Sequence, residues 1–151
     1  MHMLKELREF FAADGGGAGG GADLRLAMAV LLVEVARADQ KVAAGERAYA
    51  VRVLAHFLDL DAADAKALLA RAEETSRQAN DFFAFTTVIN ERLARPERIA
   101  LVEQMWQLAL GDADASPEEM QTISRIAGLL HLTHGEYIAA KMRAREATGV
   151  R

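Results

Sequence analysis

Apolar residues recur every three or four positions along most of this chain, which is the spacing of a helix face and not of a strand. The segment from Leu24 to about Ala38 is apolar on two adjacent rows, so it predicts a helix that is buried at the centre of a domain. The first row is Ala27, Leu31 and Val35, and the second is Met28, Leu32 and Ala36. After a loop at 39–44, the same pattern predicts a second helix that reaches about Leu58.

Side chains that cap helices mark several of the expected helix starts. Asp23 can cap the helix from Leu24, and Asp61 opens a third helix through about Thr75. The two strongest start signals come later, at Ser116-Pro117-Glu118-Glu119 and at Thr133-His134-Gly135-Glu136. The remaining helices are expected at 80–93, at 96–110 with Pro96 in the first turn, and from Thr133 to near Glu146.

The N-terminal region differs from the rest of the chain. Residues 1–14 predict a short amphipathic helix, and the glycine-rich residues 15–22 predict a flexible linker. The folded domain is then expected at 23–148, as an all-α bundle of about six or seven helices.

Composition narrows the function classes. Hydrophobic residues make up 52% of the chain but aromatic residues only 6%, which favours helix over strand. The net charge of −4 argues against a nucleic-acid partner, and the lack of cysteine excludes disulfides and sulfur-ligated zinc. No apolar run approaches the roughly 20 residues of a membrane span, so we expect a cytoplasmic protein. A homodimer is compatible with the sequence, and the alternating charges at Lys141, Arg143 and Arg145 predict a solvated face.

The second half of the chain echoes the first with a shift of 72 or 73 positions, which predicts an internal pseudo-two-fold repeat. Asp39 corresponds to Asp112, and Glu46 corresponds to Glu119, each glutamate lying seven positions after its aspartate. Beyond the glutamates the apolar positions correspond with a shift of 72.

These acidic residues are the candidate ligands of a divalent cation. An aspartate at the end of a helix faces the negative end of the helix dipole, so a compensating partner is expected. Carboxylate oxygens suit calcium, magnesium or manganese, held by Asp39 and Glu46 in one half and by Asp112, Asp114 and Glu119 in the other. The structural alternative is a turn in which each aspartate accepts loop amide hydrogens, and a capping box with Ser116 explains Glu119.

The paired pattern resembles the tellurite-resistance TerB-like family. The resemblance rests on residues 33–39 running to Glu46, and on Asp112 to Glu119 with the later segment 138–145. It implies a helical bundle with acidic sites, proposed to bind divalent metal and linked to bacterial stress responses, without an established enzymatic activity. The family usually has glycine after the aspartate, whereas this chain has Gln40 and Ala113, so the loop shapes are expected to differ.

The sequence contains no recognisable catalytic constellation, so we expect a non-enzymatic module that binds a partner protein and senses a divalent ion. Two alternatives stay open at this point. One is a metal-dependent hydrolase that uses the clustered carboxylates, which requires both acidic loops to converge on a pocket. The other is a scaffold whose N-terminal helix engages a membrane surface or a neighbouring subunit.

Overall fold

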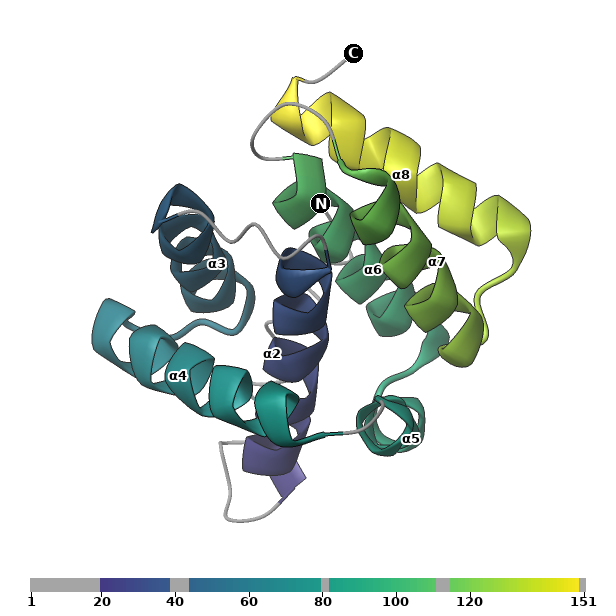
Figure 1. The fold of residues 1–151 in the computed structure, drawn as a ribbon. Coiled ribbons are helices and arrows are strands. Elements are labelled where there is room, and N and C mark those ends of the chain that lie inside the picture. Colours follow the sequence, from purple (N-terminus) through teal and green to yellow (C-terminus); the bar gives the residue numbers. More distant parts are fainter. Residues whose placement is uncertain (1–19, 39–43, 80–81, 111–114, 150–151) are drawn as a thin grey trace.

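The computed structural model describes residues 20–38, 44–79, 82–110 and 115–149, without the side chains of 20–23 and 44–46. These residues form seven α-helices and no strand, which confirms the predicted all-α fold (Figure 1). The helices are α2 (Gly20–Arg37), α3 (Ala44–Phe57), α4 (Ala62–Gln78), α5 (Phe83–Arg92), α6 (Arg95–Leu110), α7 (Pro117–Leu129) and α8 (His134–Thr148). None of them is long and apolar enough to cross a membrane.

Helix α2 begins earlier than the sequence pattern predicts. Its first residue is Gly20 and not Leu24, so the last residues of the predicted linker at 15–22 are helical. Glycine disfavours a helix interior by about 1 kcal/mol relative to alanine, but each residue added to an existing helix gains a hydrogen bond without a new nucleation cost. The predicted helix at 1–14 and residues 15–19 of the predicted linker lie outside the described residues.

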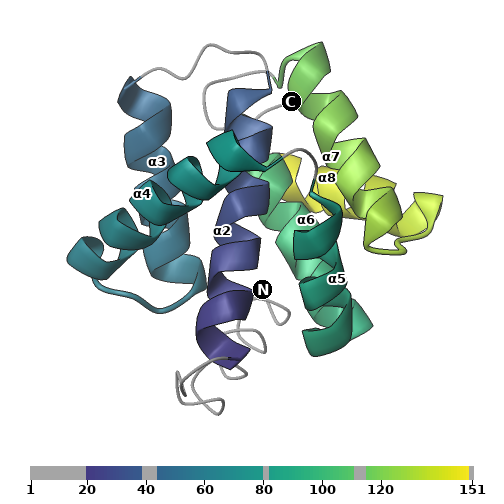
Figure 2. The same cartoon turned by 60° about the horizontal axis from the view of Figure 1, so that its bottom comes forward.

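Two helices, α2 and α6, are apolar around most of their circumference and form the centre of the domain. Helix α2 packs against α3, α4, α5, α6 and α7, and α6 also contacts α3, α7 and α8. Figures 1 and 2 show α3 and α4 on one side of α2, with α6, α7 and α8 on the other. The largest fully buried side chains of the pair are Leu24, Met28, Leu31, Leu32, Leu101 and Trp106.

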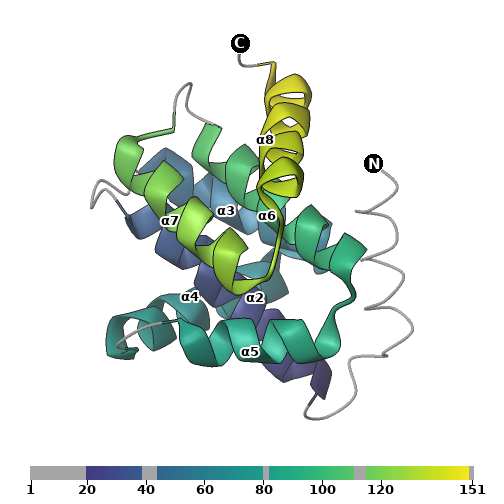
Figure 3. The same ribbon diagram turned by 90° about the vertical axis from the view of Figure 1, so that its right-hand side faces the viewer.

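Helix α8 covers the outer side of α6, as Figure 3 shows. The Trp106 ring lies 5.7 Å from the Tyr137 ring, and the Lys141 Nζ atom lies 5.0 Å from the Trp106 ring centre. Arg143 Nε donates to Glu103 Oε1 over 2.7 Å. The predicted solvated face of Lys141, Arg143 and Arg145 is therefore only partly solvated: all three residues are of intermediate exposure, and Lys141 and Arg143 contact α6.

The predicted helix starts of α4, α7 and α8 are confirmed in atomic detail. Asp61 Oδ1 accepts the Asp64 amide hydrogen over 2.7 Å. Ser116 and Thr133 each accept the amide hydrogen of a glutamate three residues later, at 3.0 and 3.1 Å, and each glutamate accepts the amide hydrogen of its cap in return. Each cap satisfies amide groups that have no partner inside the helix, so the sequence determines where these helices begin.

The ends of α3 and α7 have matching geometry. Asp59 and His131 both adopt left-handed backbone conformations, with φ of 56° and 65°. The amide after each of them donates back into the last helical turn, from Leu60 to Ala55 over 2.8 Å and from Leu132 to Ala127 over 3.1 Å. This is the Schellman arrangement of a helix end. The three corresponding pairs, 55 and 127, 59 and 131, and 60 and 132, are each 72 positions apart, which is the shift found in the sequence. The repeat as a whole stays a prediction.

An ion pair joins the starts of α6 and α8. Arg95 donates two hydrogen bonds of 2.7 Å to the carboxylate of Glu136, the same glutamate that caps α8. The hydrogen bond with Arg95, followed by the one from the Thr133 amide, lowers the pKa of Glu136 to about 2. Glu136 therefore stays ionised well below the pH at which an isolated glutamate takes up a proton.

We expect His131→Gly to stabilise the fold. A left-handed conformation costs a residue with a Cβ atom roughly 1–2 kcal/mol and costs glycine almost nothing, whereas glycine gains freedom in the unfolded chain. The net gain should be about 1 kcal/mol in urea unfolding, and the gain at Asp59→Gly should be smaller because aspartate tolerates this conformation better. A lower stability of His131→Gly would show that the imidazole makes contacts worth more than the backbone strain.

We expect Glu136→Gln to weaken the acid sensitivity of the fold. The folded pKa of Glu136 lies below its unfolded value, so its contribution to stability is present above about pH 4.5 and is lost as the pH falls towards 2. Between pH 5 and pH 2 the melting temperature of the variant should fall less than that of the parent protein. Glu91→Gln, a change on the exposed face of α5, is the control and should follow the parent curve.

Candidate functional site

The acidic residues predicted as cation ligands are only partly covered by the structure. Asp39, Asp112 and Asp114 lie outside the described residues, and Glu46 is the third residue of α3 with an undescribed side chain. Glu119, the third residue of α7, is described fully. No group of three or more histidine, cysteine or acidic side chains with metal-binding geometry occurs among the residues that the structure covers. The ligand set stays a prediction.

Glu119 has a structural role that the sequence predicted. Its side chain is 7% exposed, and its Oε1 atom accepts the Ser116 amide hydrogen over 2.9 Å. The Ser116 hydroxyl accepts the Glu119 amide hydrogen in return, which completes the capping box. One carboxylate oxygen of Glu119 is thus engaged in fixing the start of α7.

The helices around the acidic segments are arranged in a consistent way. Helix α2 ends at Arg37, two residues before Asp39, and α6 ends at Leu110, two residues before Asp112. Both C-terminal ends lie towards the same end of the domain, where α7 also begins (Figures 1 and 3). The last turn of α2 contains the basic residue Arg37, whereas the last turn of α6 contains no basic residue. The negative end of the α6 dipole therefore has less compensation from its own helix.

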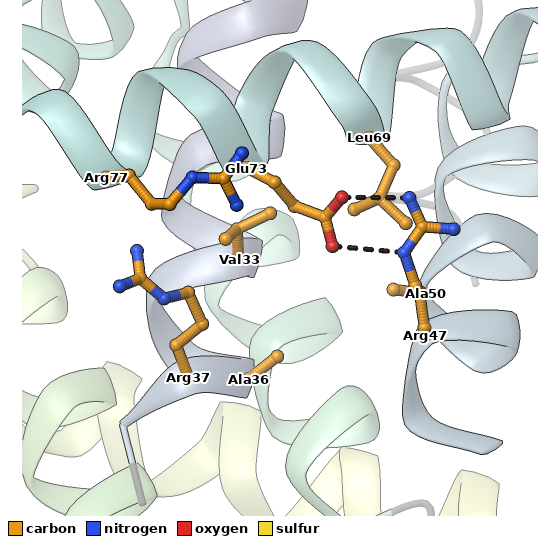
Figure 4. A pocket seen from close by; sticks show the side chains of 8 residues that line it. All are labelled: Val33, Ala36, Arg37, Arg47, Ala50, Leu69, Glu73 and Arg77. Atoms are coloured by element: carbon orange, nitrogen blue, oxygen red, sulfur yellow. Dashed lines mark hydrogen bonds and ion pairs between the residues drawn. The ribbon is translucent and has the colours of Figure 1, made fainter. Parts of the chain in front are cut away.

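A hollow of about 220 Å³ opens between α2, α3 and α4, and it is the feature of this region that the sequence did not reveal. Figure 4 shows Arg37 and Arg77 at one side, Arg47 at the other, and Glu73 between them. The apolar part of the lining consists of Val33, Ala36, Ala50 and Leu69. All four of these residues are buried, so the hollow has an apolar floor and a charged rim.

Arg47 and Glu73 fix the α3 side of this hollow. Arg47 donates to both carboxylate oxygens of Glu73, at 2.8 and 3.1 Å (Figure 4). The hydrogen bonds that Arg47 donates to Glu73, and then the charge of Glu73, raise the pKa of the Arg47 guanidinium above its usual value. A two-pronged contact of this kind holds the planar guanidinium in a defined orientation and links α3 to α4.

A second hollow of about 260 Å³ adjoins the first and shares Arg37 and Arg77 with it. Arg37 Nη1 donates to the Ser76 hydroxyl over 2.5 Å, and that hydroxyl donates to Glu34 Oε1 over 2.6 Å. Arg125 from α7 closes the far side, with its guanidinium 5.0 Å from the Phe82 ring centre. This hollow is lined mostly by polar atoms.

Sequence reasoning missed these hollows for a simple reason. Arg37, Arg47 and Arg77 each stand among alternating charges on the outer face of a different helix, a pattern typical of ordinary solvated surface. Only the packing of α2 against α4, and of α3 against α4, brings the three together. The burial of Ser76, which is only 4% exposed and lies in a hydrogen-bond network, also becomes visible only in the structure.

The described hollows contain few acidic groups. Each of the two arginine-lined hollows has a single carboxylate, Glu73 or Glu34, and no histidine among its lining residues. A third hollow, beside Arg25 and Arg71, likewise contains one carboxylate, Asp64. The Ser76 hydroxyl accepts a hydrogen bond from Arg37 Nη1 and donates one to Glu34 Oε1, so it links two charged side chains.

Comparison with known proteins identifies a family. The model of a family described as tellurite resistance protein TerB matches residues 25–142, which is most of the chain and spans α2 to α8. Searches of curated proteins and of solved structures gave no match.

We expect Glu119→Gln to leave the stability of the apo protein within about 0.5 kcal/mol, because glutamine also completes a capping box. Ser116→Ala, which removes the cap hydroxyl, should cost about 1 kcal/mol. Urea unfolding of both variants without metal measures these values. A loss of several kcal/mol for Glu119→Gln would show that the charge of this buried carboxylate stabilises the fold beyond the cap.

Proposed function

Because this chain belongs to the TerB family of tellurite resistance proteins, we propose that it is a non-enzymatic binding module whose affinity for a protein partner is tuned by a divalent cation. In this role it would serve a stress response of the tellurite type. The proposal rests first on carboxylates at corresponding positions around two helix-to-helix connections, from α2 to α3 and from α6 to α7. Asp39 and Asp112 each follow a helix by two residues, and Glu46 and Glu119 each occupy the third position of the next helix.

The donor chemistry supports a hard cation. All five residues, Asp39, Glu46, Asp112, Asp114 and Glu119, offer carboxylate oxygens, which suit calcium, magnesium or manganese. A bound cation would supply positive charge at the negative ends of α2 and α6, where the carboxylates otherwise meet an unfavourable dipole. Because Glu119 Oε1 accepts the Ser116 amide hydrogen in the capping box, we assign the main ligand role to the aspartates.

The two segments should not contribute equally. Arg37 lies in the last turn of α2 and partly compensates the helix end before Asp39. Helix α6 has no basic residue in its last turn, and Asp112 and Asp114 both follow it. The α6 segment thus combines more negative charge with less compensation, and we place the tighter cation site there.

Thermal unfolding with calcium, magnesium, manganese and zinc tests this proposal. A ligand that binds only the folded state at a hundredfold excess over its Kd adds about 2.7 kcal/mol of stability. At least one of the three hard cations should raise the melting temperature of the parent protein. Asp112→Asn should reduce that shift more than Asp39→Asn, and the double variant should abolish it.

The matched control removes the same amount of charge elsewhere. Asp64→Asn with Glu91→Gln changes two exposed carboxylates on α4 and α5, and this variant should keep the full metal-induced shift. If the control variant lost as much of the metal-induced shift as the double aspartate variant, the metals would act through general screening of charge. A melting temperature that none of the four metals changes would rule out the cation and leave a binding module without metal control.

A further inference from the structure

The two arginine-lined hollows form one continuous surface, because Arg37 and Arg77 line both. We call this surface the arginine groove and define its charged part by Arg37, Arg47, Arg77 and Arg125. It runs from the space between α2, α3 and α4 to α7, beside the C-terminal end of α2. Its apolar end has the floor of Val33, Ala36, Ala50 and Leu69 already described.

The charge of the groove is opposite to that of the chain. Its lining contains four arginines against two glutamates, Glu34 and Glu73, whereas the whole chain has a net charge of −4. Such a local excess of positive charge attracts carboxylates and orients a ligand that contains them. The planar guanidinium groups can each bind a carboxylate through two hydrogen bonds.

The existing contacts leave the arginines available for exchange with a ligand. Arg77 pairs with Glu74 over 2.6 Å, but both side chains are more than half exposed, so the pair contributes little. Arg37 binds the neutral Ser76 hydroxyl, and Arg125 stacks on Phe82. An incoming carboxylate can replace Glu74 on Arg77. It can also bind Arg37 and Arg125 without displacing another charged group, so little interaction energy is lost.

The apolar end has room for one side chain. A cavity of roughly 150 Å³ with apolar walls can hold benzene, and the hollow at this end measures about 220 Å³. It is smaller than the roughly 300–1,000 Å³ of pockets that enclose whole small molecules. An aromatic or branched aliphatic side chain would fill it, as the anchor residue of a bound segment does at a protein interface.

We propose that the arginine groove binds an acidic segment of a partner protein, with one apolar side chain between α2, α3 and α4 and carboxylates on Arg37, Arg77 and Arg125. This inference rests on the proposed function of a partner-binding module and names the chemistry of the partner. The combination of an apolar floor and an arginine rim favours a peptide over a phosphate-rich polyanion, which has no apolar group to place between the helices. The net negative charge of the chain also repels nucleic acid.

Selection from a random twelve-residue peptide library on the full chain, with and without magnesium, tests the inference. Enriched peptides should contain aspartate or glutamate next to leucine, isoleucine or phenylalanine. The affinity of the best peptide should fall at least tenfold in Arg37→Ala with Arg77→Ala. Because both side chains are exposed, helicity by circular dichroism should be unchanged.

Two further variants separate charge from shape. Arg71→Ala removes an exposed arginine from α4 outside the groove and should bind the peptide as the parent does. Ala50→Leu keeps every charge and narrows the apolar end. It should therefore lower the affinity for peptides with a large anchor residue more than the affinity for peptides whose anchor is replaced by alanine.

Several results would overturn the inference. These are the absence of enriched acidic peptides, equal binding by the parent and the double arginine variant, and displacement of the peptide by millimolar inorganic phosphate or by single-stranded RNA. Displacement by phosphate or by RNA would point to a phosphate-type ligand. Peptide affinities that are identical without metal and with each of calcium, magnesium and manganese would contradict the proposed cation control and leave the groove assignment intact.

Discussion

The fold depends on the need to bury two helices that are apolar on nearly all sides. A helix with one apolar stripe needs a single neighbour to bury that stripe. Helices α2 and α6 have apolar side chains on most of their circumference, so several helices must surround them. They cover one another in part, and the remaining helices cover the rest: α3, α4 and α5 around α2, with α7 and α8 around α6. The amphipathic helices therefore have their outer faces free for charge, and Arg47, Glu73, Arg77 and Arg125 of the groove lie on them. Arg37 and Glu34 belong to the last turns of α2 itself.

The local signals at helix ends make this packing specific. Three side-chain caps determine where α4, α7 and α8 begin, and two left-handed residues, Asp59 and His131, determine how α3 and α7 end. Short turns with defined geometry leave little freedom in the direction of the next helix. The matching turns after α3 and α7 position α4 against α2 and α8 against α6, and the first of these contacts forms one wall of the arginine groove.

The sequence predicted those parts of the structure that depend on neighbouring residues. Caps such as Ser116 with Glu119 use atoms a few positions apart, so the residue types alone indicate the contact. The start of α2 was predicted too late, because the low helix propensity of Gly20 is outweighed by growth of a helix that tertiary packing already holds. The groove was not predictable, since Arg37 and Ser76 meet across 39 positions through the packing of α2 on α4, and no local pattern contains that information.

Helix α2 connects the two surfaces to which we assign binding. Its last residue, Arg37, belongs to the groove, and Asp39 follows two positions later. Two sites that share one helix end are coupled if a ligand at either changes the position or charge of that end. Coupling of this kind is reciprocal: a cation that changes the affinity for an acidic segment by some factor must itself be bound with an affinity changed by the same factor. A cation bound by Asp39, as proposed, would reduce the negative charge two positions after Arg37 in the chain and would strengthen the attraction of Arg37 for an incoming carboxylate. The sign of the coupling is therefore positive, and the acidic partner and the cation should each promote binding of the other.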